Sequence, residues 1–145
     1  RCDIKAIALL PNVLMRQQAT EQGAAEAILI RDGLMTEGSA SNIFVVLKGA
    51  LVTPPKGPFI LPGVTRDLAL ELARAHGLAC QERDVTESEL RSAGELMLSS
   101  SMKELLPITR LDGKPVGGGK PGPLHARLHA LYQDYIRDFR AGIVE

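Results

Sequence analysis

Four groups of polar residues along the chain have the types and settings that chemistry requires. A lysine, Lys5, lies close to the start, and a carboxylate, Glu37, ends an apolar segment. Gly63-Val64-Thr65 precedes an amphipathic stretch, and Ser99-Ser100-Ser101 follows a second apolar segment. Taken singly, each group has an ordinary structural explanation: a solvated charge, a strand end, a loop that enters a helix, and a polar strand end.

Taken together, the four groups could serve one pyridine cofactor that carries a phosphate. The amine of Lys5 can form a Schiff base when burial or a positive neighbour makes it neutral. The Glu37 carboxylate can keep a ring nitrogen protonated, so that the ring withdraws electrons. A glycine-led helix start at Gly63 offers a phosphate backbone N–H groups and a positive dipole end. The hydroxyls of Ser100 and Ser101 can donate further hydrogen bonds.

Four stretches, in family order and at family-like spacing, resemble motifs of the fold-type IV (class IV) pyridoxal-phosphate-dependent aminotransferases. They are Arg1-Cys2-Asp3-Ile4-Lys5 with Leu9-Leu10-Pro11-Asn12-Val13, then Thr36-Glu37-Gly38-Ser39-Ala40-Ser41-Asn42-Ile43-Phe44, Leu61-Pro62-Gly63-Val64-Thr65-Arg66, and Leu111-Asp112-Gly113-Lys114-Pro115-Val116-Gly117. The first is similar to the lysine segment of D-amino-acid aminotransferases. The second and third are similar to T-E-G-x-x-S-N and L-P-G-[IV]-T-R. Together they cover nearly the whole chain.

The resemblance implies a role for each candidate residue. Lys5 is the catalytic residue, which forms the aldimine and moves a proton between the substrate α-carbon and the cofactor. The other implied cofactor contacts are Glu37 at the ring nitrogen, Leu61 against the ring, Gly63, Val64 and Thr65 at the phosphate, and Ser100 and Ser101 beside the phosphate or ring oxygen. Two interpretations of Arg1 stay open: a structural ion pair, or a charge near the lysine or the phosphate.

The implied activity is transamination between an amino acid, D-alanine for example, and a 2-oxo acid, by a homodimer that uses pyridoxal 5′-phosphate. Branched-chain L-amino-acid transfer, R-selective amine transfer and aminodeoxychorismate lyase chemistry on the same fold are alternatives. A catalytically incomplete fragment or dimerisation module is another, because the family's smaller N-terminal domain is absent here. Met102 also departs from the family pattern, since it stands where a small hydroxyl residue is expected.

The composition of the chain argues against several other classes of protein. The 145 residues suit one domain, 1–145, and 17 basic residues balance 17 acidic ones, so neither nucleic acid nor an anionic membrane is an expected partner. No apolar run reaches the roughly 20 residues of a membrane span. Two widely spaced cysteines, Cys2 and Cys80, favour a reducing cytoplasm. His125 and His129 share a helical face, but without an evident third ligand no metal site is expected.

The elements that must position these residues alternate in type, which favours an α/β (mixed α+β) fold. The resemblance implies the C-terminal large domain of a fold-type IV enzyme, a mixed sheet or pseudo-barrel with flanking helices. Turn signals at Asp32-Gly33, Lys48-Gly49 and Asp112-Gly113 predict hairpins, and Thr86 to Glu89 is a capping box. The predicted helices are 11–22, with Val13, Leu14 and Ala19 facing a core, 64–76, with Val64, Leu68, Leu72 and Ala75 on one face, and a last helix from about Pro121. The predicted strands are 25–31, 34–37, 42–47, 50–53, 80–85, 95–99 and 106–111.

Overall fold

The computed structural model describes residues 1–5 and 10–144, so Leu9 of the first motif lies outside the described residues. In chain order the elements are α1 (Leu10–Glu21), β1 (Ile28–Arg31), β2 (Leu34–Gly38), β3 (Asn42–Leu47), β4 (Ala50–Thr53), α2 (Val64–Ala75), β5 (Cys80–Glu82), β6 (Val85–Thr86), α3 (Glu87–Ser92), β7 (Glu95–Ser100), β8 (Glu104–Ile108), β9 (Arg110–Leu111), β10 (Lys114–Pro115) and α4 (Pro123–Arg140). The mixed α/β class predicted from the sequence is confirmed.

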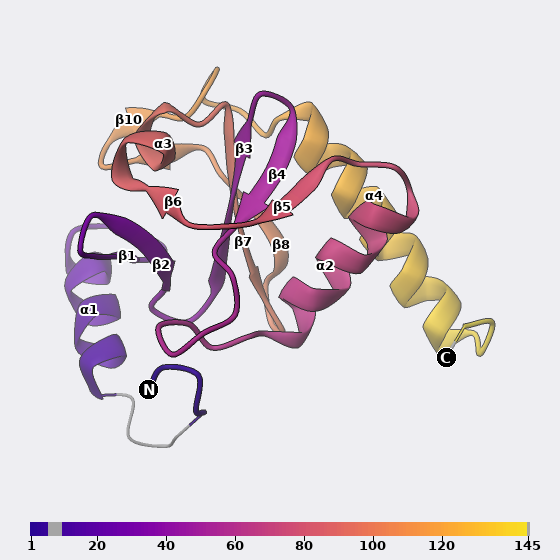
Figure 1. Cartoon of the computed structure of the whole chain (residues 1–145), viewed down its shortest axis with the longest axis horizontal. Coiled ribbons are helices and arrows are strands. Elements are labelled where there is room, and N and C mark those ends of the chain that lie inside the picture. Colours follow the sequence, from indigo (N-terminus) through magenta and orange to yellow (C-terminus); the bar gives the residue numbers. More distant parts are fainter. Residues whose placement is uncertain (6–9, 145) are drawn as a thin grey trace.

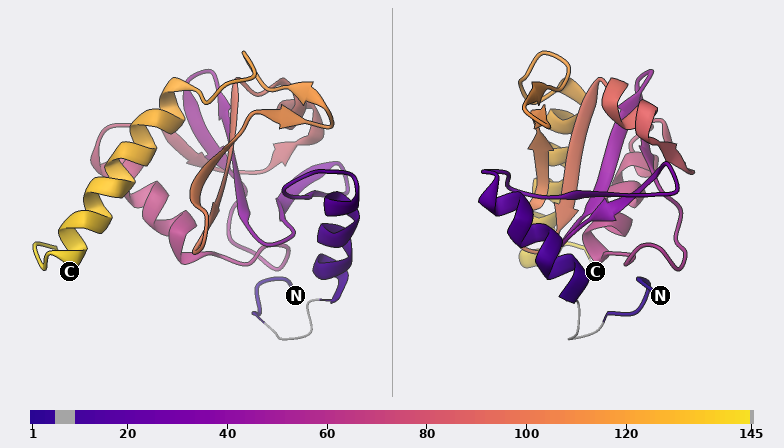
Figure 2. Two further views of the ribbon diagram at one scale, coloured as in Figure 1. Left: turned by 180° about the vertical axis from the view of Figure 1, so that it is seen from behind. Right: turned by 90° about the vertical axis from the view of Figure 1, so that its left-hand side faces the viewer.

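An open five-stranded sheet, in the order β5-β4-β3-β7-β8, forms the centre of the molecule. Helices α2 and α4 cover one face of it, while the β1–β2 hairpin, β6 and α3 lie on the other side (Figure 1). A further view from behind and one from the side show the same layers (Figure 2). No helix in the described part of the chain is long and apolar enough to cross a membrane.

Strand β3 is buried on both faces, which explains its unbroken apolar run. Phe44 and Val46 belong to the core cluster beneath α2 and α4. Ile43 and Val45 belong to the cluster on the opposite face. Because successive side chains of a strand point to opposite faces, a strand between two packed layers must be apolar at every position.

The predicted hairpin turns form for a local reason. Asp32-Gly33, Lys48-Gly49 and Asp112-Gly113 all have positive φ at both residues, from 48° to 77°. This is the backbone of the turn that suits twisted antiparallel strands, and a glycine in the second position removes the steric cost. The capping box from Thr86 to Glu89 is also present, with both of its hydrogen bonds.

Two of the predicted apolar faces are wrong. Val13 and Leu14 of α1 are 56% and 54% exposed, because this helix lies beside the β1–β2 hairpin and away from the central sheet (Figure 1). In α2, Leu72 is buried as predicted, but Val64 is 81% exposed. The buried face of α2 is instead made by Thr65, Arg66, Ala69, Leu70, Leu72 and Ala73.

The buried side chain of Arg66 explains why this face of α2, and not the predicted one, is turned toward the core. Its guanidinium donates to the carbonyl oxygen of Pro54 at 2.8 Å and to Glu82 Oε1 at 2.7 Å, so it ties the helix to the ends of β4 and β5. A helical pattern that counts only apolar residues cannot place this face. In the last helix, by contrast, the apolar residues Leu128 and Tyr132 are buried, although Phe139 at its end is 54% exposed.

Two predicted strands are shorter or divided in the structure. The segment 80–85 is split into β5 and β6, which belong to different sheets, and the segment 106–111 is split into β8 and β9. Glu104, which has φ 56°, opens β8 two residues earlier than predicted. The last helix begins at Pro123, close to the predicted Pro121.

Candidate functional site

The topology brings distant motifs to one edge of the central sheet. Strand β3 runs antiparallel to both β4 and β7, so the start of β3 lies beside the ends of its two neighbours. Asn42, the first residue of β3, is the register partner of Ser99. The loop from the end of β4 then returns to the start of α2, which is the crossover helix between parallel β4 and β5. Glu37, Asn42, the segment 61–63 and Ser99 therefore meet at this edge.

Glu37 lies near the end of β2 at this edge and is 5% exposed. Its Oε2 accepts a hydrogen bond from the backbone N–H of Leu61 at 2.9 Å. Burial raises the pKa of the Glu37 carboxyl above its usual range; the Leu61 N–H opposes this rise, and the negative charge of Glu26 adds to it. A positive group next to the carboxylate would offset that burial.

Helix α2 begins at Val64, shortly after Leu61, with Gly63 just before it. Gly63 is the N-cap, and no side chain caps this helix among the described residues. The first amides of a helix lack intrahelical partners, and the helix dipole makes this end positive. A Cβ at Gly63 would lie 2.6 Å from Asn42 Oδ1, so glycine is needed for close packing. The buried Thr65 adds a hydroxyl to the same turn.

Gly63 differs in one respect from its expected role. Its own N–H donates to Asn42 Oδ1 at 3.1 Å, so it is engaged within the protein. The N–H groups of Val64, Thr65 and Arg66 precede the first intrahelical bond, which Asp67 donates to the Gly63 carbonyl oxygen, and those of Val64 and Thr65 are the amides that the sequence predicted for a phosphate. The side chain of Val64 points outward and is 81% exposed, so only its backbone contributes.

The serine cluster ends β7 at the same edge. Ser100 Oγ accepts the backbone N–H of Lys103 at 3.0 Å, and its hydroxyl hydrogen can still be donated. Ser99 is 2% exposed, and its Oγ has no hydrogen-bond partner among the described residues. Ser101 is exposed, and Met102 is 96% exposed. The edge thus carries hydroxyl donors beside the opening of α2.

The N-terminal segment lies against the loop before α2, through a hydrogen bond from the Cys2 N–H to the Pro58 carbonyl oxygen at 2.6 Å. Lys5 is exposed. Arg1 forms an exposed two-point ion pair with Asp3, at 2.9 and 2.8 Å. Arg1, Asp3, Lys56 and Pro62 line a hollow of about 500 Å³ between the two segments.

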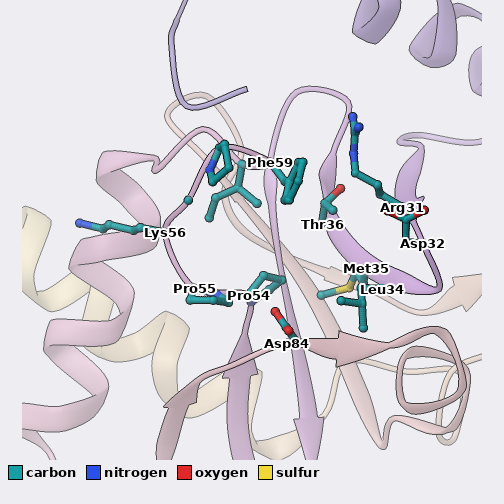
Figure 3. Close-up of a pocket in the computed structure, with 13 residues that line it drawn as sticks. Arg31, Asp32, Leu34, Met35, Thr36, Pro54, Pro55, Lys56, Phe59 and Asp84 are labelled. Atoms are coloured by element: carbon teal, nitrogen blue, oxygen red, sulfur yellow. The ribbon is translucent and has the colours of Figure 1, made fainter. Parts of the chain in front are cut away.

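A separate cavity of about 240 Å³ lies beside this edge (Figure 3). Arg31, Thr36, Phe59 and Asp84 contribute to its lining, and the Arg31 guanidinium lies 5.0 Å from the centre of the Phe59 ring. None of the predicted site residues, all of which the structure describes, lines it. This cavity is therefore not the predicted cofactor site, although Thr36, which lines it, is the sequence neighbour of Glu37.

Sequence reasoning missed Glu26, which holds the turn between β2 and β3. Its carboxylate accepts hydrogen bonds from the Ser39 hydroxyl, from the Ser41 hydroxyl at 2.9 Å and from the backbone N–H of Ala27 at 2.8 Å. Burial alone would raise the pKa of Glu26, but these bonds outweigh it and leave the pKa lowered. No motif signal marks this residue, because the fold creates its contacts.

Residues 1–5 and 10–144 contain no group of three or more side chains that could hold a metal ion. His125 and His129 stack with ring centroids 5.5 Å apart, and His125 Nε2 lies 3.0 Å from the Leu105 carbonyl oxygen. Both histidines are thus used in packing the last helix. Cys2 and Cys80 are free thiols.

The family profile described as "Amino-transferase class IV" matches residues 1–111. The chain belongs to the class IV aminotransferases. It is 44% identical to the D-alanine aminotransferase of Bacillus licheniformis over 94% of this chain and 48% of the relative, and 42% identical to that of Listeria monocytogenes over 94% and 47%. The chain thus spans about half the length of these curated relatives.

Solved structures of the same family share the fold. A branched-chain amino acid aminotransferase from Thermobaculum terrenum, in a structure described as the PLP-form, has a TM-score of 0.88 and 35% identity over 96% of this chain and 47% of its own. The Escherichia coli branched-chain amino acid aminotransferase has a TM-score of 0.83 and 32% identity over 94% of this chain and 45% of its own. The predicted fold-type IV architecture is confirmed.

Proposed function

We propose that the protein carrying this chain is a pyridoxal-phosphate-dependent aminotransferase that acts on a D-amino acid, such as D-alanine, and a 2-oxo acid, with Lys5 as the catalytic residue. The observation that carries the proposal is the hydrogen bond from Leu61 to the buried Glu37 carboxylate. This bond connects the Glu37 carboxylate on β2 to the segment that leads into α2. Family membership and the names of the curated relatives support the same activity.

The residues at the edge fit this cofactor. Glu37 supplies a buried carboxylate whose charge a protonated ring nitrogen would balance. Val64 and Thr65 supply amides at an uncapped helix start, with Ser100 and Ser101 nearby at the end of β7. Leu61 supplies an apolar side chain between them. When bound, pyridoxal phosphate supplies a ring that withdraws electrons from the α-carbon of the amino acid.

Lys5 has two tasks in this proposal. Its Nζ forms the covalent attachment to the cofactor, and as a free neutral amine it takes the proton from the substrate α-carbon and returns it on the other side of the transfer. Both tasks need an amine that can be uncharged, which lysine provides and arginine does not. Water must be excluded while the proton moves, and the apolar Leu61 and the buried Glu37 contribute to that on the cofactor side.

Branched-chain L-amino-acid transfer is the second candidate function. It is favoured by the two solved structures named above, both of which are of branched-chain amino acid aminotransferases. The D-amino-acid proposal rests on the higher identity to D-alanine aminotransferases, 44% against 35% for the Thermobaculum enzyme. The position at which the substrate carboxylate binds decides whether a D- or an L-amino acid reacts. An activity assay with both kinds of substrate therefore distinguishes the two candidate functions.

A homodimer in the cytoplasm completes the proposal. Exposed apolar residues of α1, among them Leu10, Val13 and Leu14, offer a surface that a second copy could cover. Two free cysteines suit a reducing compartment.

The decisive experiment is incubation with pyridoxal phosphate, reduction with borohydride to make the cofactor–lysine link permanent, and mapping of the modified peptide by mass spectrometry. We expect the label on Lys5, followed by turnover of D-alanine with 2-oxoglutarate. Label scattered over exposed lysines such as Lys114 would overturn the assignment of Lys5. Turnover of L-leucine in place of D-alanine would select the branched-chain alternative.

A further inference from the structure

Two side chains hold the short segment Leu61-Pro62-Gly63 at both of its ends. Glu37 Oε2 accepts from the Leu61 N–H at 2.9 Å. Asn42 Nδ2 donates to the Leu61 carbonyl oxygen at 2.9 Å, and Asn42 Oδ1 accepts from the Gly63 N–H at 3.1 Å. Since Pro62 has no N–H, both N–H groups of this segment are bound by side chains from β2 and β3.

The side-chain amide of Asn42 suits this task. It offers a donor and an acceptor side by side, and here the donor meets the Leu61 carbonyl oxygen and the acceptor meets the Gly63 N–H. Asn42 is 6% exposed and begins β3, whose backbone is paired with β7 at this position. The sheet thus fixes the backbone of Asn42, and the hydrogen bonds of its side chain hold the segment before α2 in place relative to the sheet.

The contact is close as well as polar. The position of Oδ1 leaves no room for a side chain at residue 63, where a Cβ would come within 2.6 Å of it. The backbone of Gly63 has φ −70° and ψ 144°, which any residue can adopt. Glycine is therefore required here for close approach to Asn42 and not for its backbone freedom.

We propose that Asn42 is a positioning residue for phosphate recognition: by holding Leu61 and Gly63, it sets the direction of the Val64 and Thr65 amides at the start of α2. This inference rests on the proposed function, since it concerns the phosphate of the same cofactor. Asn42 touches the segment and not the cofactor, so its effect is confined to the phosphate end of the site. It gives the N-cap Gly63 the anchoring that a capping side chain would otherwise provide.

The test compares equilibrium binding of pyridoxal phosphate and pyridoxal, which differ only in the phosphate. In the unaltered protein we expect a strong preference for the phosphorylated form. In Asn42→Ala that preference falls by roughly 10- to 100-fold, the range expected when hydrogen bonds to a charged group are misaligned, while the affinity for pyridoxal changes by less than about 3-fold. Gly63→Ala, which displaces Asn42 without removing its amide, gives the same selective loss.

Thr53→Val is the matched control. The Thr53 hydroxyl is buried at the same edge and donates to the Ile43 carbonyl oxygen at 2.7 Å, away from the segment 61–63. We expect this variant to lose thermal stability and keep the preference for pyridoxal phosphate. If Asn42→Ala and Gly63→Ala keep the preference, or if Thr53→Val loses it equally, the positioning role is wrong. If the unaltered protein binds neither form at Lys5, the proposed function fails instead.

Discussion

Two parts of the candidate site are built in opposite ways. The clamped edge, which consists of Glu37, Asn42 and Leu61–Gly63, is largely buried, and its segment is held by three side-chain hydrogen bonds. The N-terminal region, which consists of residues 1–5 and α1, is mostly exposed, and none of the twelve residues of α1 is buried. The first part gains its geometry from the central sheet, whereas the second is attached to the fold by individual contacts such as the 3.1 Å bond from Asn12 to the Ser39 carbonyl oxygen.

Under the proposed function, this difference separates the residues that recognise the cofactor from the lysine that takes part in the reaction. Groups that recognise a ring and a phosphate must be preorganised, because hydrogen bonds to a phosphate depend on direction. A lysine that alternates between covalent attachment and proton transfer must be able to move. The comparison therefore predicts that changes at the clamped edge affect stability and binding together, whereas changes in the N-terminal region affect the reaction alone.

The largest expected effect comes from Lys5→Arg. This variant keeps the positive charge but removes the amine that can become neutral, so turnover should fall by roughly a thousand-fold or more, as it does when a covalent nucleophile is removed. Because Lys5 is exposed, the free energy of unfolding should change by less than about 0.5 kcal/mol. Steady-state kinetics and urea denaturation measure the two quantities, with Lys114→Arg as the control. A large loss of stability would contradict the division between the regions.

A pair of leucine truncations compares the helices directly. Leu70 of α2 is 2% exposed and Leu14 of α1 is 54% exposed. Leu70→Ala should lower the free energy of unfolding by about 2–5 kcal/mol, because it leaves a cavity in the core beneath α2. Leu14→Ala should lower it by no more than about 0.5 kcal/mol. Denaturant titration of both variants at several protein concentrations is the measurement; a large, concentration-dependent loss in Leu14→Ala would show that a second copy covers α1.

The Glu37→Gln variant should separate stability from activity within the clamped edge. Glutamine can still accept from the Leu61 N–H but cannot balance a protonated ring nitrogen, so turnover should fall on the order of 100-fold. Without cofactor, the same change should stabilise the protein at neutral pH, because burial raises the pKa of Glu37 and makes its ionised form unfavourable in the folded state.

The sign of the pH dependence follows from that raised pKa. The folded protein holds the Glu37 proton more tightly than the unfolded chain, in which the pKa of a glutamate is about 4.3. This contribution to stability is complete below that pH and is lost as the pH rises through the higher folded-state pKa. The stability difference between Glu37→Gln and the unaltered protein should therefore be small near pH 4 and larger near pH 7. A difference that shrinks with rising pH would refute the raised pKa.

Much of the local structure could be predicted because its causes are local. Asp32-Gly33 and Lys48-Gly49 form turns through the conformational preferences of two residues, and the capping box at Thr86 involves four consecutive positions. The strand 42–47 was predicted from its apolar run alone. The motif resemblance, in turn, selected a family that the fold and the similarity to known proteins confirm.

The faces of α1 and α2 could not be predicted by the same means. Periodicity identifies which residues are apolar, but the rotation of a helix depends on what lies opposite. In α2 the buried Arg66 replaces an apolar residue because Pro54 and Glu82 accept its hydrogen bonds. In α1 the apolar residues Val13 and Leu14 face outward, since the helix lies beside the hairpin and not on the sheet.

The sequence by itself determined the types of chemical group at the site, since a lysine, a carboxylate, a glycine-led helix start and serine hydroxyls are properties of residues. Only the tertiary structure decided which of these groups are already engaged. In the folded chain the Gly63 N–H donates to Asn42, and Val64 and Thr65 begin the helix without a capping side chain. The fold also buries Glu37, which raises its pKa. The physical reason is that a hydrogen bond and a pKa depend on neighbours, and strand pairing brought these neighbours together from positions about 20 residues apart or more.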